Sequence, residues 1–150
     1  MSVDQLREVQ RLARELYGEP PTELHGVLHV VSAVRSGERW RVIKIGTQAP
    51  KSATDFFVLN FWRAHCDAIV TTAQVARAEP TLSHELQGPL ALGLTAYRRQ
   101  VLAKTQRPLC VVMTRGAGLA ETHRMWSDDV DYLVLTAPGA VNELQGRLQA

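Results

Sequence analysis

The chain has 150 residues, of which 45% are hydrophobic, 21% are charged and 6% are aromatic. This length suits one domain, and the composition is that of an ordinary globular protein rather than of a disordered or fibrous one. The 17 basic and 15 acidic residues are scattered along the chain and give a formal net charge of +2. Because no long basic stripe is present, we do not expect binding to nucleic acid.

The N-terminal segment and the cysteines limit the class of protein further. Asp4, Glu8 and Glu15 lie among arginines in the first eighteen residues, which is unlike a signal or transit peptide. No stretch approaches the roughly 18 apolar residues of a membrane span. We therefore expect a cytoplasmic protein that does not insert into membranes. Cys66 and Cys110 lack any CxxC spacing, so we expect two buried reduced thiols rather than a zinc site or a disulfide.

The first predicted element is an amphipathic helix. Its apolar residues recur every three or four positions, with arginines and Glu15 between them, and Gly18 ends the pattern. Pro20 and Pro21 then favour an extended linker. We treat residues 1–22 as this helix and linker, and residues 23–150 as one α/β domain. The apolar stripe consists of Leu6, Val9, Leu12, Leu16 and Tyr17.

Two β-rich runs follow, residues 26–34 and 39–45, which we expect to form a hairpin joined at Ser36-Gly37 and leading into a sheet. From Ser52 onward the pattern alternates between helix and strand. The predicted helices lie around residues 56–64, 90–104, 120–127 and 140–148, and the predicted strands at 67–71, 108–114 and 130–136.

This alternation predicts an α/β fold with a mostly parallel sheet, because right-handed crossovers join successive strands. The strands are apolar almost throughout, so we expect helices on both faces of the sheet. Ligands of such sheets bind beyond the carboxyl ends of the strands. That rule singles out residues 46–51, 71–80 and 114–118.

Two of these strand ends carry suitable polar groups. Thr114, Arg115 and Gly116 end a buried strand and suit a phosphate, although such residues also occur in ordinary turns. Residues 71–80 hold two threonines, an arginine and a glutamate that could place a polar substrate against a cofactor. In the alternative interpretation, Thr71 caps a turn and Arg77 pairs with Glu79 in solvent.

No metal site or catalytic triad is predicted. The five histidines form no HExxH motif, so no metal is expected. The sequence contains no GxSxG motif, and Ser83-His84 resembles a helix N-cap region. No catalytic side chain is assigned.

The segment 51–70 resembles the reductase domain of RibD-type proteins, which share the dihydrofolate-reductase-like fold. In that family a Ser-x-x-Asp opens a helix that ends Arg-Ala-x-x-Asp-Ala-Ile and runs into a strand. The resemblance covers roughly residues 42–138, with residues 71–80 and 108–115 also similar to family segments. The matching frame residues are Ser52, Asp55, Arg63, Asp67, Ala68 and Ile69.

The resemblance implies an NADPH-dependent activity like that of 5-amino-6-(5-phosphoribosylamino)uracil reductase of riboflavin biosynthesis. Hydride would pass to a pyrimidine or pteridine-like small-molecule substrate, and no side-chain nucleophile is needed. We also expect a homo-oligomer, the homodimer being the simplest case. The implied NADPH-binding residues are Thr71, Thr72, Thr114, Arg115 and Gly116, and the implied substrate-binding residues are Lys44, Ser52, Arg77 and Glu79.

Two departures from the family leave an alternative open. Thr71, Thr72 and Gln74 stand where the family has glycines that let the backbone approach the cofactor closely. The later Glu-Gly-Gly-Pro turn of the family has no counterpart in these residues, so the fold would be incomplete at its C-terminus, with exposed sheet edges. The alternative function is a catalytically degenerate relative that binds nucleotides or oligomerises.

Overall fold

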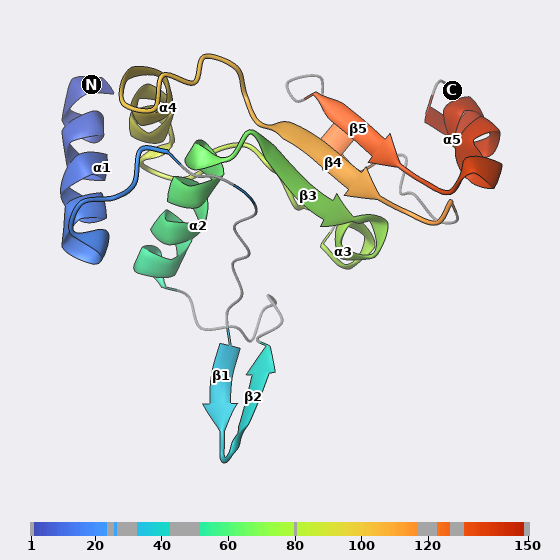
Figure 1. The fold of residues 1–150 in the computed structure, drawn as a ribbon, viewed down its shortest axis with the longest axis horizontal. Coiled ribbons are helices and arrows are strands. Elements are labelled where there is room, and N and C mark those ends of the chain that lie inside the picture. Colours follow the sequence, from blue (N-terminus) through green and yellow to red (C-terminus); the bar gives the residue numbers. More distant parts are fainter. Residues whose placement is uncertain are drawn as a thin grey trace.

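The computed structural model describes residues 2–23, 26, 33–42, 52–79, 81–116, 123–126 and 131–148. The described elements form a helical body, a three-stranded sheet and a separate hairpin (Figure 1). In chain order they are α1 (Ser2–Tyr17), β1 (Ala33–Ser36), β2 (Arg39–Val42), α2 (Ala53–His65), β3 (Ala68–Thr72), α3 (Ala73–Ala78), α4 (Ala91–Gln100), β4 (Leu109–Met113), η1 (Arg124–Trp126), β5 (Tyr132–Leu135), η2 (Pro138–Ala140) and α5 (Val141–Leu148).

Helices α1, α2 and α4 form the helical body. The predicted N-terminal helix is confirmed, and Gly18 ends it with a left-handed φ of 72°. Val9 of α1, Phe61 of α2 and Leu94 of α4 are the fully buried centre of one apolar cluster. The ring of Tyr17 stacks on Phe61, with 5.7 Å between the ring centroids. The apolar stripe of α1 therefore packs on the other helices of this chain.

The sheet is parallel, with strand order β3-β4-β5. The α/β class and the parallel sheet predicted from the sequence are thus confirmed. Each crossover contains helical structure, as parallel neighbours require. The register sets Thr72 beside Met113 and Met113 beside Leu135, so the three strands end level with one another.

Only one face of this sheet is covered within the described residues. Cys110 and Val112 of β4 lie on that face with Thr71 of β3, under residues of α3, η1, η2 and α5. The opposite face leaves apolar side chains open on the edge strands and at the strand ends: Val70 is 62% exposed, Met113 48%, Leu133 45% and Leu135 47%, whereas Val111 at its centre is buried.

The prediction of helices on both faces is therefore wrong for the described part of the chain. Helices α1, α2 and α4 gather beyond the amino ends of the strands, while α3 and α5 lie toward the carboxyl ends (Figure 1). Apolar strands on their own do not indicate which face is covered, because both faces of each strand carry apolar residues.

The hairpin is present but lies apart from the parallel sheet. Strands β1 and β2 pair antiparallel through a turn at Gly37-Glu38, where Gly37 has a φ of 62°. They form their own two-stranded sheet and project away from the helical body (Figure 1). The expectation that the hairpin leads into a larger sheet is not met by the described residues, and its predicted parts at 27–32 and 43–45 lie outside them.

The remaining helices differ in length from the predictions. Helix α4 is shorter than the predicted 90–104, because Ala103 takes a left-handed φ of 54° and the Lys104 N–H bonds the Arg98 carbonyl. In place of the predicted helix at 120–127, the described residues contain only the 3₁₀ turn η1. A short helix, α3, follows β3 directly where a loop was expected.

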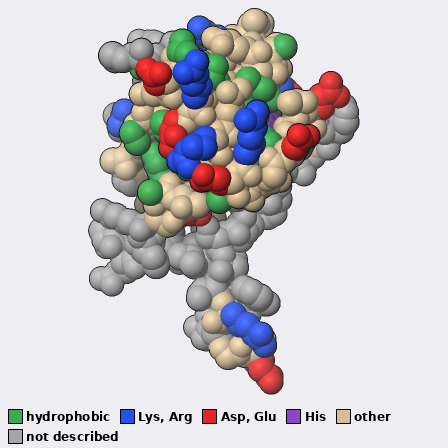
Figure 2. Space-filling model, turned by 90° about the vertical axis from the view of Figure 1, so that its left-hand side faces the viewer, with side chains coloured by type: hydrophobic (Ala, Val, Ile, Leu, Met, Phe, Trp, Pro, Cys, Tyr) green, Lys and Arg blue, Asp and Glu red, His purple; other side chains and the backbone are tan. Residues whose placement is uncertain are grey.

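Charged side chains are mixed over the side of the molecule that α1 occupies. Figure 2 shows basic and acidic side chains interspersed on this face rather than gathered in one stripe. Arg11, for example, pairs with both Glu8 and Glu15 along α1. None of the described helices is long and apolar enough to cross a membrane.

Candidate functional site

A cavity of about 670 Å³ lies at the carboxyl edge of the parallel sheet. Residues at the end of all three strands contribute to it, together with the first turns of α3. Parallel α/β sheets commonly bind ligands at this edge. The lining residues are Thr72, Ala73, Gln74, Arg77, Met113, Thr114, Arg115, Leu135 and Thr136.

Three threonines line the cavity, one from the end of each strand. The Thr72 Oγ1 accepts the Val75 N–H at 3.2 Å and so caps α3, and the Thr114 Oγ1 accepts the Gly116 N–H at 3.2 Å. Because a hydroxyl has one proton and two lone pairs, both side chains keep a proton to donate. Accepting the backbone N–H groups also holds each oxygen in place.

The third threonine, Thr136, does not expose its hydroxyl to the cavity. Its Oγ1 is buried, and it has no hydrogen-bond partner among the described residues. A buried polar atom without a partner costs on the order of 1–3 kcal/mol.

Two arginines give the cavity its charge. Arg77 comes from α3 and Arg115 from the turn after β4, and both are exposed. No carboxylate lies among the described lining residues. The combination of guanidinium groups and hydroxyl donors suits the oxygens of a phosphate.

The structure brings together four of the residues predicted from the sequence: Thr72, Arg77, Thr114 and Arg115. Gly116 directly follows Arg115, is buried and has a φ of 111°. A Cβ at this glycine would lie 2.5 Å from the Ala140 Cβ. Gly116 therefore lets the turn pack against η2, and its N–H holds Thr114, but it does not line the cavity.

Thr71 was expected beside the cofactor, and this placement is wrong. Its side chain is buried on the covered face of the sheet, in register with Val112. Successive residues of a strand point to opposite faces, so Thr71 and Thr72 cannot both face the same ligand. Thr72 is the one that lines the cavity.

The four predicted substrate residues are dispersed. Ser52 caps α2 by accepting the Asp55 N–H at 3.2 Å and does not line the cavity. Glu79 ends α3, and its backbone carbonyl meets the His123 ring at 2.8 Å. Arg77 lines the cavity, and Lys44 lies outside the described residues.

Gln74 and Thr136 line the cavity but were not singled out from the sequence. Thr136 follows β5 just as Thr114 follows β4. The same rule that selects polar residues after each parallel strand could therefore have found it. In the sequence, Gln74 stands out only as a departure from the family pattern. It lines the cavity because α3 begins directly after β3.

Neither cysteine serves as a reactive group at this edge. Cys110 is completely buried on the covered face, and burial raises the pKa of its thiol to about 11. Burial also raises the pKa of Cys66, which is half-buried beside Trp62. Both thiols are free and hold their protons near neutral pH. Within the described residues, no group of three or more His, Cys, Asp or Glu could hold a metal ion.

Comparisons with known proteins leave the family undetermined. No protein-family model matches the chain. Searches of curated proteins and of solved structures also found no match. The resemblance to RibD-type reductases therefore stays a prediction from the sequence.

Proposed function

We propose that the carboxyl-edge cavity binds the phosphate groups of NADPH, and that the protein is a reductase of a pyrimidine or pteridine-like substrate. The observation that carries the binding is that Arg77, Arg115, Thr72 and Thr114 all line one cavity. The reductase part is supported by the resemblance to RibD-type proteins over roughly residues 42–138.

The charge and the donors of the cavity suit a phosphate monoester. Arg115 presents a planar set of N–H donors that can bind two phosphate oxygens at once. Thr114 lies next to it, with a hydroxyl proton to donate. We assign the 2′-phosphate of NADPH to this pair, because it is the group that distinguishes NADPH from NADH.

The volume of the cavity is also suitable. About 670 Å³ falls within the range of roughly 300–1,000 Å³ typical of small-molecule sites. Arg77 and Gln74 on α3 lie toward β3, away from Arg115 along the edge, and we assign them to the substrate or to the nicotinamide end. Hydride transfer itself is chemistry that the cofactor supplies.

Thermal unfolding with NADPH, NADH, 2′,5′-ADP and 5′-ADP tests the binding step. At about one hundred times the dissociation constant, a ligand adds roughly 2.7 kcal/mol to the free energy of unfolding. We expect NADPH to stabilise the protein more than NADH does, and 2′,5′-ADP to stabilise it more than 5′-ADP does, because NADH and 5′-ADP lack the 2′-phosphate. Arg115→Ala should weaken this binding by about tenfold or more, as expected for loss of a charge-assisted bond.

Arg7→Ala is the matched control, since Arg7 is another exposed arginine and lies on α1, far from the sheet edge. Equal loss in both variants would indicate attraction by net charge alone. If none of the four ligands stabilises the protein, the nucleotide-binding proposal is wrong. Consumption of NADPH with a pyrimidine substrate then tests the reductase step separately.

A second candidate is an oligomerising module, favoured by the open apolar face of the sheet. Val70, Met113, Leu133 and Leu135 are all at least 45% exposed on that face. An exposed apolar surface of this kind often marks a contact with another protein chain. The occupant we propose is a second copy of this chain, because a twofold axis sets this apolar face against an identical one.

Sedimentation of the wild-type chain and two variants tests this candidate. Leu133→Lys should shift a dimer to the monomer, since it buries a charge in the contact. Leu16→Lys changes a leucine of similar exposure on α1 and should leave the dimer intact. A wild-type chain that sediments as a monomer at high concentration would exclude the second candidate.

A further inference from the structure

A second cavity lies at the opposite end of β4 from the proposed nucleotide site. It has a volume of about 270 Å³ and lies between α4, residues 84–86 and residues 104–108. Pro108 lines this cavity and Met113 lines the first. Four residues of strand lie between them, so the two are five residue steps or about 16 Å apart.

The second cavity has a strong excess of positive charge. Four cationic side chains line it, those of Arg98, Arg99, Lys104 and Arg107, against one carboxylate, that of Glu85. The Glu85 carboxylate is 4.0 Å from Arg107, and both side chains are partly exposed. A single exposed pair of this kind is weak, and Arg107 also has a further interaction within the chain.

Two of the cations are fixed by the fold. Arg98 is buried and donates to the carbonyls of Ala64, Cys66 and Gln106 at 2.7–2.8 Å. Lys104 donates to the His65 carbonyl and to Asp67. Carbonyl groups orient Arg98 without neutralising its charge, whereas Asp67 pairs with Lys104 at 2.6 Å and also lies near Arg98, so the positive charge at the base of the cavity is partly compensated.

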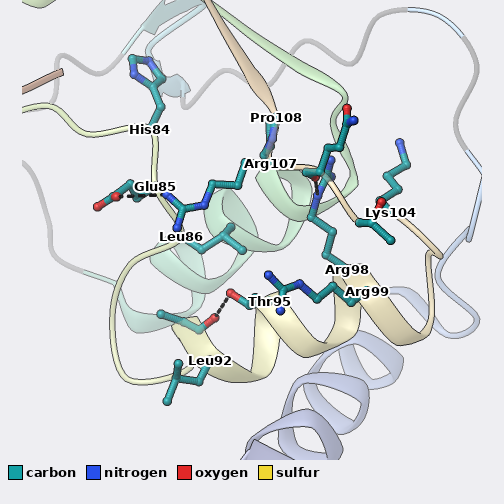
Figure 3. A pocket seen from close by; sticks show the side chains of 13 residues that line it. His84, Glu85, Leu86, Leu92, Thr95, Arg98, Arg99, Lys104, Arg107 and Pro108 are labelled. Atoms are coloured by element: carbon teal, nitrogen blue, oxygen red, sulfur yellow. Dashed lines mark hydrogen bonds and ion pairs between the residues drawn. The ribbon is translucent and has the colours of Figure 1, made fainter. Parts of the chain in front are cut away.

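The other two cations, Arg99 and Arg107, also line the cavity. Figure 3 shows Arg99 extending along α4 toward Thr95, and Arg107 extending above it toward Glu85 and Leu86. The Arg99 side chain makes no hydrogen bond or ion pair with any part of the chain that the structure describes. Its side chain leans toward the N-terminus of α4, as helical side chains do, so it does not serve to cap the carbonyls at the end of that helix.

The rest of the wall is apolar. Leu86, Ala91, Leu92 and Pro108 line the cavity beside the cations. Leu92 is 57% exposed, so part of this wall is open to solvent. A volume of 270 Å³ lies at the lower end of ligand sites, which suits a small molecule and is too little for a dinucleotide.

We propose that this cavity binds a small organic oxyanion, a phosphate or carboxylate attached to a compact apolar group. The oxyanion lies between the Arg99 and Arg107 guanidinium groups, and the apolar group contacts Leu86, Leu92 and Pro108. The Thr95 hydroxyl already donates to the Ala91 carbonyl, so it orients one side of the wall rather than the anion.

The experiment is an NMR titration of the full chain with phenyl phosphate, phenylacetate and benzyl alcohol. We expect saturable shifts at amides of residues 84–108 with one of the two anions, with a Kd near or below about 1 mM. Benzyl alcohol, which lacks the charge, should bind at least about tenfold more weakly. The stronger of the two anions identifies the oxyanion class.

Three variants test which residues bind the anion. Arg99→Gln with Arg107→Gln should weaken binding by about tenfold or more. Arg7→Gln with Arg14→Gln removes two exposed arginines from α1 and should leave anion binding unchanged. Should the double pocket variant lose its native spectrum, Arg99→Glu alone, which changes one exposed side chain, gives the same test.

Equal weakening in the α1 control, or shifts that never saturate, would overturn the proposal. The two cavities are separable in this experiment. Arg115→Ala should not alter binding of the phenyl anions, and Arg99→Gln should not alter stabilisation by NADPH.

Discussion

Gly93 of α4 lies directly against the backbone of Gln5 in α1. A Cβ added to Gly93 would come within 2.6 Å of the Gln5 carbonyl oxygen, closer than any such contact in a relaxed structure. The absence of a side chain therefore sets how closely these two helices approach. The Gln5 amide also donates to the Pro89 carbonyl at 3.0 Å, which fixes the start of α4 beside α1.

Gly93→Ala should destabilise the protein although alanine is the better helix former. The helical preference gains about 1 kcal/mol, but separating two packed helices costs more, so we expect a net loss of about 1–2 kcal/mol. Gly146→Ala in α5 is the control, because nothing lies within 4 Å of the added Cβ. Gly146→Ala should leave the free energy of unfolding unchanged or raise it slightly. Urea unfolding of both variants measures the difference, and an unchanged midpoint for Gly93→Ala would contradict this packing.

Arg98 connects α4 to the chain that leads from α2 into β3. Arg98→Met keeps most of the buried volume but leaves the Ala64, Cys66 and Gln106 carbonyls without their donor. We expect a loss on the order of 3 kcal/mol in the free energy of unfolding. Arg99→Met, one residue further along the same helix and exposed, should change stability by less than about 0.5 kcal/mol. Similar losses in the two variants would show that the carbonyl bonds contribute little.

Ser52 is a cap of α2 rather than a ligand-binding residue. Ser52→Ala should lower the free energy of unfolding by about 1 kcal/mol, since the Asp55 N–H loses its acceptor. Ser52→Asp restores an acceptor and should recover the stability. Stabilisation by NADPH should be the same in all three proteins. A selective loss of ligand response in Ser52→Ala would return this residue to the substrate site.

His84 makes the protein less stable in acid. It is buried, and burial together with nearby Arg63 and His123 lowers its pKa to about 4. In the unfolded chain its pKa is about 6.5. Below that pH the unfolded chain binds a proton at His84, whereas the folded protein does not bind this proton until about pH 4. The free energy of unfolding should therefore fall as the pH drops through this window, by up to about 3 kcal/mol.

His84→Phe removes this titration while keeping a ring of similar size. The loss of the Nδ1 atom should be tolerated, since that atom is buried and has no partner among the described residues. Urea unfolding at several pH values between 7 and 4 compares the two proteins. The slope with pH should be shallower for the variant, and identical slopes would mean that His84 is not the group responsible.

The amino-acid sequence by itself determined the type and order of most elements. The three- and four-residue spacing from Leu6 to Tyr17 is a local signal, and α1 follows it. Short apolar runs between amphipathic segments likewise predicted β3, β4 and β5 and their parallel pairing. The rule that ligands lie beyond parallel strand ends also selected Thr72, Arg77, Thr114 and Arg115, which line one cavity.

Only the tertiary structure decided which side of each strand is covered. Thr71 and Thr72 are alike in the sequence, but α3 covers the face of Thr71 and leaves Thr72 at the cavity. Both faces of these strands are apolar, so periodicity carries no information on this choice. The cationic cavity at Arg99 and Arg107 could not be predicted from the sequence either. It combines side chains from α4, from the loop after α4 and from residues 84–86, and no local sequence pattern connects these segments.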